Sequence, residues 1–178
     1  MTYIGLAQIA VFTALIAGLT KPFGFYMARV FAGERTVLRP LLGPIEKIVY
    51  RVAGVDPAKE QSWLDYVFSF LSFNCFGILA FYALPRLQVL LPFNPQEMTG
   101  VPPDLSLNTA ISFTTNTSWQ SYAGETTLSY FSQMTGTTVH SFLSAGSGIA
   151  VAIALIRGFA SRHALTIGNF WADMVRAT

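Results

Sequence analysis

Residues 105–124, LSLNTAISFTTNTSWQSYAG, decide how this chain folds, because they carry no charge and yet are rich in hydrogen-bonding groups. Eleven of these twenty side chains are those of Ser, Thr, Asn or Gln. A lipid-facing helix with this composition would bury polar groups without partners, which costs free energy. Polar backbone at membrane depth persists only inside protein or beside a water-filled cavity. The stretch is therefore predicted to be a re-entrant loop.

The composition around this stretch is that of a membrane protein. Hydrophobic residues make up 52% of the 178 residues and charged residues 11%, whereas soluble domains carry about 25% charged residues. The net charge of +2 and the absence of a basic stripe argue against nucleic acid as a partner. A single cysteine, Cys75, excludes an internal disulfide, and two histidines cannot complete a zinc site.

Three other uncharged stretches have the length and apolar content of membrane-spanning helices. They are residues 3–20, 66–84 and 137–156. The predicted fold class is an all-α membrane protein with three transmembrane helices, one re-entrant pore helix and a filter loop.

The first half of the polar stretch is expected to form a short helix. Asp104 follows two prolines and is the expected N-cap. About ten helical residues rise roughly 15 Å, half the hydrocarbon thickness. Residues 114–118 are then expected to be extended.

The predicted cation ligands are the backbone and side-chain oxygens of this extended run, Thr114, Thr115, Asn116, Thr117 and Ser118. A dehydrated cation needs several oxygens, and the C-terminal end of a helix carries about −0.5 of an elementary charge. The alternative is a polar loop or ordinary interhelical hydrogen bonding.

Further residues of the stretch are expected to support the loop and line its mouth. Trp119 and Tyr122 are expected to hold the loop in shape, and Gln120, Gly124 and Glu125 to lie at its mouth. His140 is expected to be hydrogen-bonded inside the helix bundle, with a pH-sensing role as the alternative.

Loop charges predict the orientation in the membrane. Seven Lys or Arg residues lie between the first two spans, and three follow the last span, whereas only Arg86 lies between the second and the last. Residues 21–65 and 157–178 are therefore expected in the cytoplasm, and the N-terminus and the pore mouth outside. Within the first cytoplasmic loop, residues 39–52 have the pattern of an amphipathic helix, which would lie on anionic headgroups or pack against the rest of the assembly.

Residues 113–134, FTTNTSWQSYAGETTLSYFSQM, closely resemble the first selectivity-filter loop of the potassium-binding A subunit of the bacterial Kdp-type potassium-transporting ATPase. The resemblance extends to PFNPQ (92–96), LNTAISF (107–113), SFLSAGSGIA (141–150) and GNFWAD (168–173).

The resemblance implies a channel-like subunit that binds K⁺ and admits it from outside, in an ATP-driven high-affinity uptake pump of the bacterial inner membrane. The implied partners are a P-type catalytic subunit, which hydrolyses the ATP, small accessory membrane subunits, lipid and the remaining repeats of the same subunit. No catalytic site and no organic cofactor are expected in this chain. By this analogy residues 1–30 are an extra helix, 31–62 a cytoplasmic basic loop, 63–160 the first helix–pore loop–helix repeat, and 161–178 a cytoplasmic segment leading to missing repeats.

Two departures from the family pattern bear on this interpretation. The family subunit has four filter loops and is about three times longer, so other repeats or chains are expected to complete the ion cage. Ser118 stands where the family's filter has asparagine, which puts fine selectivity in question. The alternatives are a channel-type potassium uptake subunit without ATP coupling and a non-transporting membrane scaffold.

Overall fold

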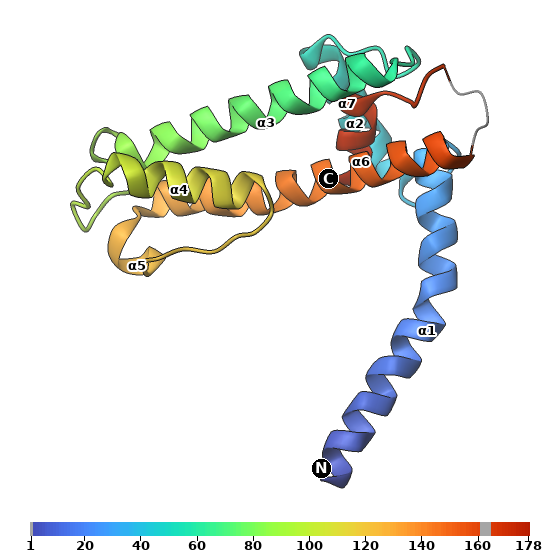
Figure 1. Cartoon of the computed structure of the whole chain (residues 1–178), viewed down its shortest axis with the longest axis horizontal. Helices are drawn as coiled ribbons and strands as arrows, with labels where there is room; N and C mark the ends of the chain where they lie inside the picture. Colours follow the sequence, from blue (N-terminus) through green and yellow to red (C-terminus); the bar gives the residue numbers. More distant parts are fainter. Residues whose placement is uncertain (1, 161–164) are drawn as a thin grey trace. The chain divides into compact units, whose positions relative to one another are not determined.

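The computed structural model describes residues 2–160 and 165–178, and this part of the chain is helical, without β-strands. The elements are α1 (Tyr3–Phe31), α2 (Arg39–Ala53), α3 (Trp63–Arg86), the 3-10 turn η1 (Gln88–Leu90), α4 (Pro103–Thr114), α5 (Gly124–Thr127), the π-helix η2 (Ser132–Thr138), α6 (Val139–Ala160) and α7 (Phe170–Ala177) (Figure 1). Residues 161–164, where the predicted C-terminal segment begins, lie outside the described residues.

In the described part of the chain, three helical segments are long and apolar enough to cross a membrane: Tyr3–Phe31, Trp63–Arg86 and Ser132–Ala160. The predicted all-α fold with three membrane-length helices is confirmed. Each helix runs past its predicted end. The predicted ends were placed at the first charge or polar run, but backbone hydrogen bonding continues through these residues.

The chain divides into two compact units, residues 1–49 and 50–178. In the first unit, Thr2 caps α1 by accepting a hydrogen bond from the Gly5 amide at 3.3 Å. The hydroxyls of Thr13 and Thr20 donate to carbonyls four residues earlier, so these polar side chains need no partner outside the helix. Gly33 ends α1 with a positive φ of 71°, a conformation that glycine adopts without steric cost.

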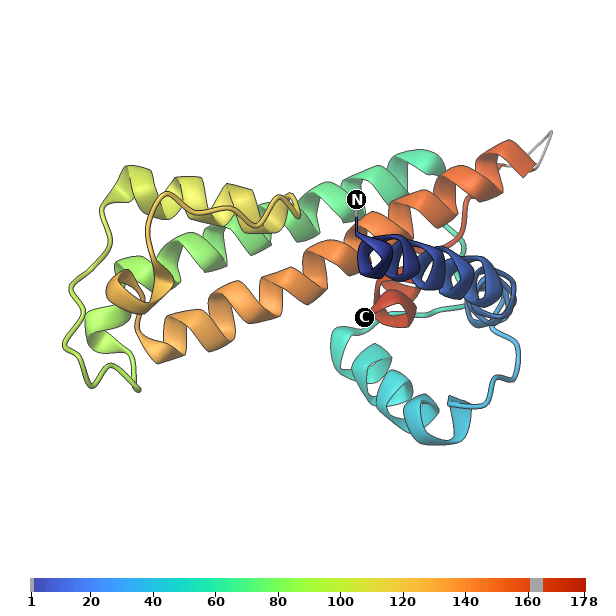
Figure 2. The ribbon, with the colours of Figure 1, turned by 90° about the horizontal axis from the view of Figure 1, so that it is seen from below.

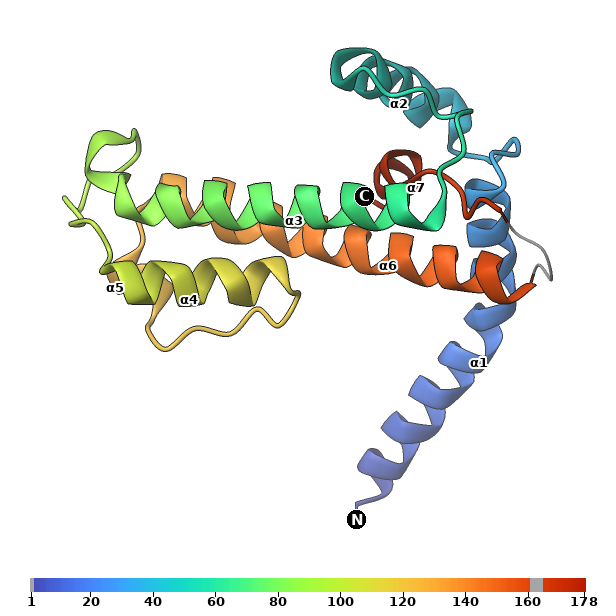
Figure 3. The same cartoon turned by 45° about the horizontal axis from the view of Figure 1, so that its top comes forward.

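The second unit is built on two long helices, α3 and α6, which are joined by side-chain contacts such as the hydrogen bond from the Tyr66 hydroxyl to Ala150 O at 2.8 Å (Figures 1 and 3). The shorter α4 packs against one half of this pair, and α7 packs against the other half. We call the end where α3 finishes and η2 begins the loop end, and the end where α3 begins and α6 finishes the anchor end. Because α4 has only twelve residues, it reaches about halfway along its neighbours.

At the loop end, the centre of the packing is Phe81, which is fully buried against Ala110 and Phe113 of α4. The rings of Phe81 and Phe113 meet edge to face with centroids 5.5 Å apart. On the other side, Gly136 of η2 lies so close to Phe81 that an added Cβ would be 2.5 Å from the ring. The phenyl ring therefore joins α3, α4 and η2.

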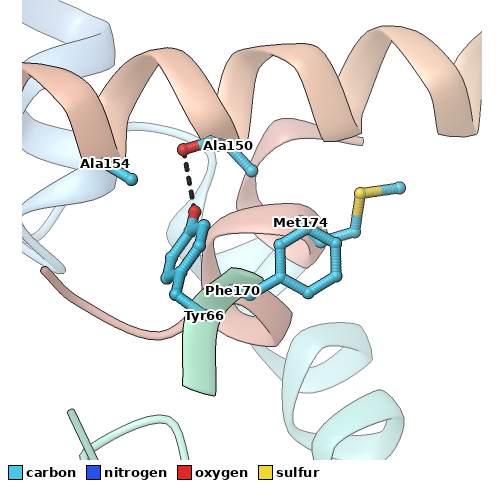
Figure 4. Close-up of a cluster of buried hydrophobic side chains, with 5 residues drawn as sticks. All are labelled: Tyr66, Ala150, Ala154, Phe170 and Met174. Carbon is cyan, nitrogen blue, oxygen red and sulfur yellow. Dashed lines mark hydrogen bonds between the residues drawn. The ribbon is translucent and has the colours of Figure 1, made fainter. Parts of the chain in front are cut away.

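At the anchor end, the core contains Tyr66, Ala150, Ala154, Phe170 and Met174 (Figure 4). Small residues on α6 let α7 approach closely, and an added Cβ on Gly146 would lie 3.4 Å from the Met174 methyl group. Close van der Waals packing of this kind contributes to helix association where the surroundings are lipid.

A candidate cation-binding loop

The helix that leads into the candidate loop begins two residues earlier than expected. Pro103 is the first residue of α4, and Asp104 lies in its first turn without forming a side-chain cap. The prediction of Asp104 as the N-cap is therefore wrong. Proline is favoured at the first helical position, since its φ is already helical and the amide it lacks would have no partner there.

The C-terminus of α4 ends in a tight turn. Asn116 lies in the left-handed region, with φ 61°. Its backbone N–H donates to Phe113 O at 3.3 Å, and the backbone N–H of Thr117 donates to Ser112 O at 2.9 Å. These two bonds form a Schellman motif. Ser118 also has a positive φ, of 56°. The predicted extended run is therefore wrong, because satisfying the last carbonyls of α4 requires a left-handed residue directly after it.

This turn leaves a run of backbone carbonyls without donors. Among the described residues, none donates a hydrogen bond to the carbonyl oxygens of residues 114–118. The run lies at the C-terminal end of α4, where the helix dipole places partial negative charge. Free carbonyls at such an end are suited to a cation and unsuited to an anion.

The side-chain oxygens of the same run add to these carbonyls. The Thr114 hydroxyl is buried and has no hydrogen-bond partner in the described part of the chain. The Thr115 hydroxyl donates to Ile111 O at 2.8 Å and lies 3.2 Å from the Thr117 hydroxyl. The structure thus brings the predicted ligands Thr114, Thr115, Asn116, Thr117 and Ser118 together in one turn.

The segment that returns from this turn, residues 115–123, runs back beside α4 (Figure 2). Three sets of contacts hold it against the helices. The Ser112 hydroxyl bonds to both the amide and the carbonyl of Trp119, each at 2.9 Å. The Ser144 hydroxyl of α6 donates to Asn116 Oδ1 at 3.2 Å, and Thr109 and Tyr122 join their hydroxyls at 3.0 Å. Sequence reasoning missed Ser112, Thr109 and Ser144, although the first two belong to the polar run that it singled out.

The residues predicted at the mouth line a cavity of about 470 Å³ beside the returning segment. Gln120, Tyr122, Gly124 and Glu125 contribute to its wall, together with Gln133. The Gln133 amide donates to Gly124 O at 3.3 Å and to Leu128 O at 3.0 Å, so it fixes the α5 turn. Trp119 does not line this cavity. Its side chain is about half exposed, and its backbone N–H and carbonyl are hydrogen-bonded to the Ser112 hydroxyl.

The anchor end holds a buried ionic cluster that sequence reasoning also missed. Asp173 of α7 is 1% exposed and pairs with Arg157 of α6 through bonds of 2.5 and 2.9 Å. The Tyr66 hydroxyl shares its proton between Asp173 Oδ2 at 3.2 Å and Ala150 O at 2.8 Å. Asn169 caps the N-terminus of α7, its side chain accepting from the Ala172 amide, and such a capping residue is a sequence signal from which this helix could have been predicted.

The geometry defines an all-helical membrane protein in which a short helix and a returning loop lie against two long helices. The family model described as potassium-transporting ATPase A subunit matches residues 10–178. The chain belongs to this family.

The chain is also similar in sequence, over its full length, to individual relatives. It is 61% identical over 178 residues to the potassium-transporting ATPase potassium-binding subunit of Rhodospirillum centenum. It is 57% identical to the subunit of that name from a strain of Methylorubrum extorquens, and 53% identical to that from Sorangium cellulosum. In each case the match covers 100% of this chain and 31% of the relative, so the chain spans about a third of the length of these proteins.

Proposed function

We propose that this chain is the part of a potassium-binding, channel-like subunit that contributes one cation-coordinating loop to an ATP-driven potassium pump. The observation that carries the proposal is the run of five carbonyl oxygens at residues 114–118, none of which accepts a hydrogen bond from a described residue. The names of the relatives, which call them potassium-binding subunits of a potassium-transporting ATPase, support the choice of ion.

The chemistry of these oxygens favours a monovalent cation. Residues 114–118 include no carboxylate, and Mg²⁺ and Ca²⁺ sites normally use carboxylate oxygens. K⁺ holds its water less tightly, and neutral carbonyls can replace its hydration shell. Glu125, at the wall of the neighbouring cavity, would attract cations toward the loop without binding them directly.

One loop cannot surround an ion. In this proposal residues 63–160 form the first helix–pore loop–helix repeat, and further repeats of the same subunit complete the cage. Residues 1–30 are an extra helix, residues 31–62 a cytoplasmic loop, and residues 161–178 lead toward those repeats. A separate P-type subunit hydrolyses the ATP, and small accessory membrane subunits are further partners.

The proposed orientation in the inner membrane follows from the loop charges. The loop end faces outside and the anchor end faces the cytoplasm, since the basic residues concentrate near the anchor end and in residues 21–59. Single cysteines at Gln96 and Thr36, in a Cys75→Ala background, test this by labelling intact cells with an impermeant maleimide. Labelling at position 36 and not at 96 contradicts the proposed orientation.

The binding proposal is tested by adding a positive charge beside the loop. Gln120→Arg in the complete transporter is expected to weaken the apparent affinity for K⁺ by about tenfold or more, since two like charges at an effective dielectric constant of about 20 repel by over ~1 kcal/mol within about 10 Å. Uptake is measured at micromolar and millimolar K⁺. Gln96→Arg, at an exposed position in the segment before α4, is the matched control.

An unchanged affinity in a normally assembled Gln120→Arg complex contradicts the proposal. That result favours a scaffold role for this part of the subunit. An equal loss of affinity in both variants shows instead that charge acts on the approach of the ion and not at the loop.

A further inference from the structure

Helix α2 carries an apolar stripe that is exposed in the described part of the chain. At about 100° per residue, the side chains of this stripe fall within an arc of about 120° on one side of the helix. All of them are at least 40% exposed; they are Leu41, Leu42, Ile45, Ile48, Val49 and Val52. We call these residues the apolar face of α2. A contiguous exposed apolar surface marks a contact with a membrane or with another protein.

The other sides of the helix carry its charges. Arg39 and Arg51 lie on either side of the apolar face, each about 60° from its edge, and Lys47 lies further round beyond Arg51. All three basic residues are exposed, and the helix has one acidic residue, Glu46. An apolar face between basic residues is the pattern of a helix that lies in the plane of a membrane surface, where long basic side chains reach the headgroups.

Contacts within the first unit place the start of α2 beside the end of α1. Arg39, the first residue of α2, donates from Nη1 to Gly33 O at 3.1 Å, directly after α1. Arg29, in the last turn of α1, donates to Arg35 O at 2.9 Å and pairs with Glu34 through Nε at 3.2 Å. The connection therefore folds back on the end of α1. Because α1 is long and apolar enough to cross a membrane, the start of α2 lies near the level at which such a helix leaves the lipid.

The buried residue of α2 lies outside its apolar face. Tyr50 is 7% exposed, and its hydroxyl donates to Ala172 O at 3.5 Å. Its position on the helix is about 140° from the centre of the apolar face. The attachment of α2 through Tyr50 therefore leaves the apolar face unused.

The composition of the apolar face fits lipid better than a protein partner. All of its side chains are Leu, Ile or Val. The centres of protein interfaces are enriched in aromatic residues and methionine, and Leu and Val are under-represented among the residues that contribute most to binding. Aliphatic side chains flanked by Lys and Arg instead match acyl chains beneath anionic headgroups.

We infer that α2 is an interfacial helix that inserts its apolar face among lipid acyl chains and binds anionic phospholipid headgroups through Lys47 and Arg51. Arg39 contributes less to headgroup binding, since its guanidinium already donates to Gly33 O. The inference concerns the contact with the bilayer alone. It requires neither K⁺ binding by residues 114–118 nor a particular orientation in the membrane, so its failure and that of the proposed function are separate results.

The depth of the apolar face is measured on the complete transporter in lipid nanodiscs. Ile45→Cys, in a Cys75→Ala background without other reactive cysteines, is labelled with a bimane fluorophore, which is quenched by lipids carrying a nitroxide at carbon 5 of the acyl chain. We expect at least about twofold more quenching than at Gly43→Cys, because an interfacial helix inserts about 5–10 Å into the boundary between headgroups and acyl chains. Gly43 is the matched control, since it lies on the opposite side of α2 and an added Cβ would meet only Arg39 Cγ, at 3.6 Å.

Val52→Cys, about two turns further along the same face, repeats the measurement. Both positions on the apolar face should be quenched more strongly than Gly43→Cys. If either is not, protein covers that part of the face, and the inference is overturned.

The headgroup preference is measured by placing the nitroxide on phosphatidylglycerol or on phosphatidylcholine, at the same mole fraction in an otherwise identical mixture. Quenching at Ile45→Cys should be about twofold or more stronger with the anionic lipid, since basic residues near the surface attract it. The change of Lys47 and Arg51 to Gln should make the two lipids quench equally.

The control for charge removes two basic residues outside α2. Arg35→Gln with Lys59→Gln lowers the net charge by the same amount at exposed positions and should keep the preference for phosphatidylglycerol. Equal quenching by the two lipids in the unaltered helix overturns anionic headgroup binding. A preference that survives Lys47→Gln with Arg51→Gln, or that is lost equally in the control, overturns the assignment of these two residues.

Discussion

The two ends of the α3–α6 pair are held together by different chemistry. At the loop end, the Gln88 side chain donates to Thr99 O at 2.5 Å and Thr127 O at 3.0 Å, and accepts from the Ser129 amide at 2.9 Å. At the anchor end, Asp173 bonds to Arg157 and Tyr66. Both Gln88 and Asp173 are fully buried or nearly so.

The difference lies in what remains when one partner is lost. A neutral cluster leaves unpaired amides and carbonyls, whereas a buried ion pair leaves an uncompensated charge, which costs more. The neutral cluster also adds no net charge to the loop end. The anchor end is therefore held by a buried ion pair, and the loop end by the neutral hydrogen bonds of Gln88.

The largest effect is expected from Asp173→Ala. Removing one partner of a buried ion pair costs about 3–5 kcal/mol, and the lower value applies here because Arg157 is 30% exposed. The expected result is a clear drop in the thermal unfolding temperature of the purified complex. Asp104→Ala, at an exposed carboxylate, is the control. If Asp104→Ala lowers the unfolding temperature as much as Asp173→Ala does, the buried ion pair does not stabilise the anchor end in the way described.

Gln88→Leu is expected to have a smaller but still substantial effect. It leaves two carbonyls and one amide without their partner, which costs about 1–3 kcal/mol. The same thermal unfolding measurement checks this, with Gln96→Leu as the exposed control. A loss as large as that of Asp173→Ala would show that neutral and ionic clusters contribute equally.

Gly136→Ala tests the apolar packing around Phe81 at the loop end. Its Cβ would lie 2.5 Å from the Phe81 ring, and overpacking of this kind costs about 1–3 kcal/mol. Phe81→Leu in the same chain should recover part of the loss, since it removes the ring that the new methyl group meets. If the double variant is less stable than the sum of the single changes predicts, the contact is not the cause.

The smallest effect is expected from Ser118→Gly. The backbone at Ser118 has φ 56°, which glycine adopts more easily, so stability should hold or rise by up to about 1 kcal/mol. The apparent K⁺ affinity in uptake assays should stay within about twofold, because the carbonyl is kept. A larger loss would assign the hydroxyl, and not the carbonyl, as the ligand, with Thr126→Gly on α5 as a control for loop flexibility.

The amino-acid sequence was sufficient for the parts of the fold that follow from local composition. Three uncharged apolar stretches predicted three membrane-length helices, since spanning a membrane depends on length and hydropathy alone. The polar stretch before Gly124 predicted a segment that cannot cross as a lipid-facing helix. Both properties are local, and each can be read within a window of about twenty residues.

The tertiary structure decided which of those polar groups lack partners. Asn116 takes a left-handed conformation because the last carbonyls of α4 need donors, and Ser112 and Ser144 hold the loop from two different helices. Asp173 meets Arg157 across 16 residues, and Gln88 meets Ser129 across 41. Contacts between distant residues depend on how the helices pack, and no local pattern specifies which carbonyl remains free.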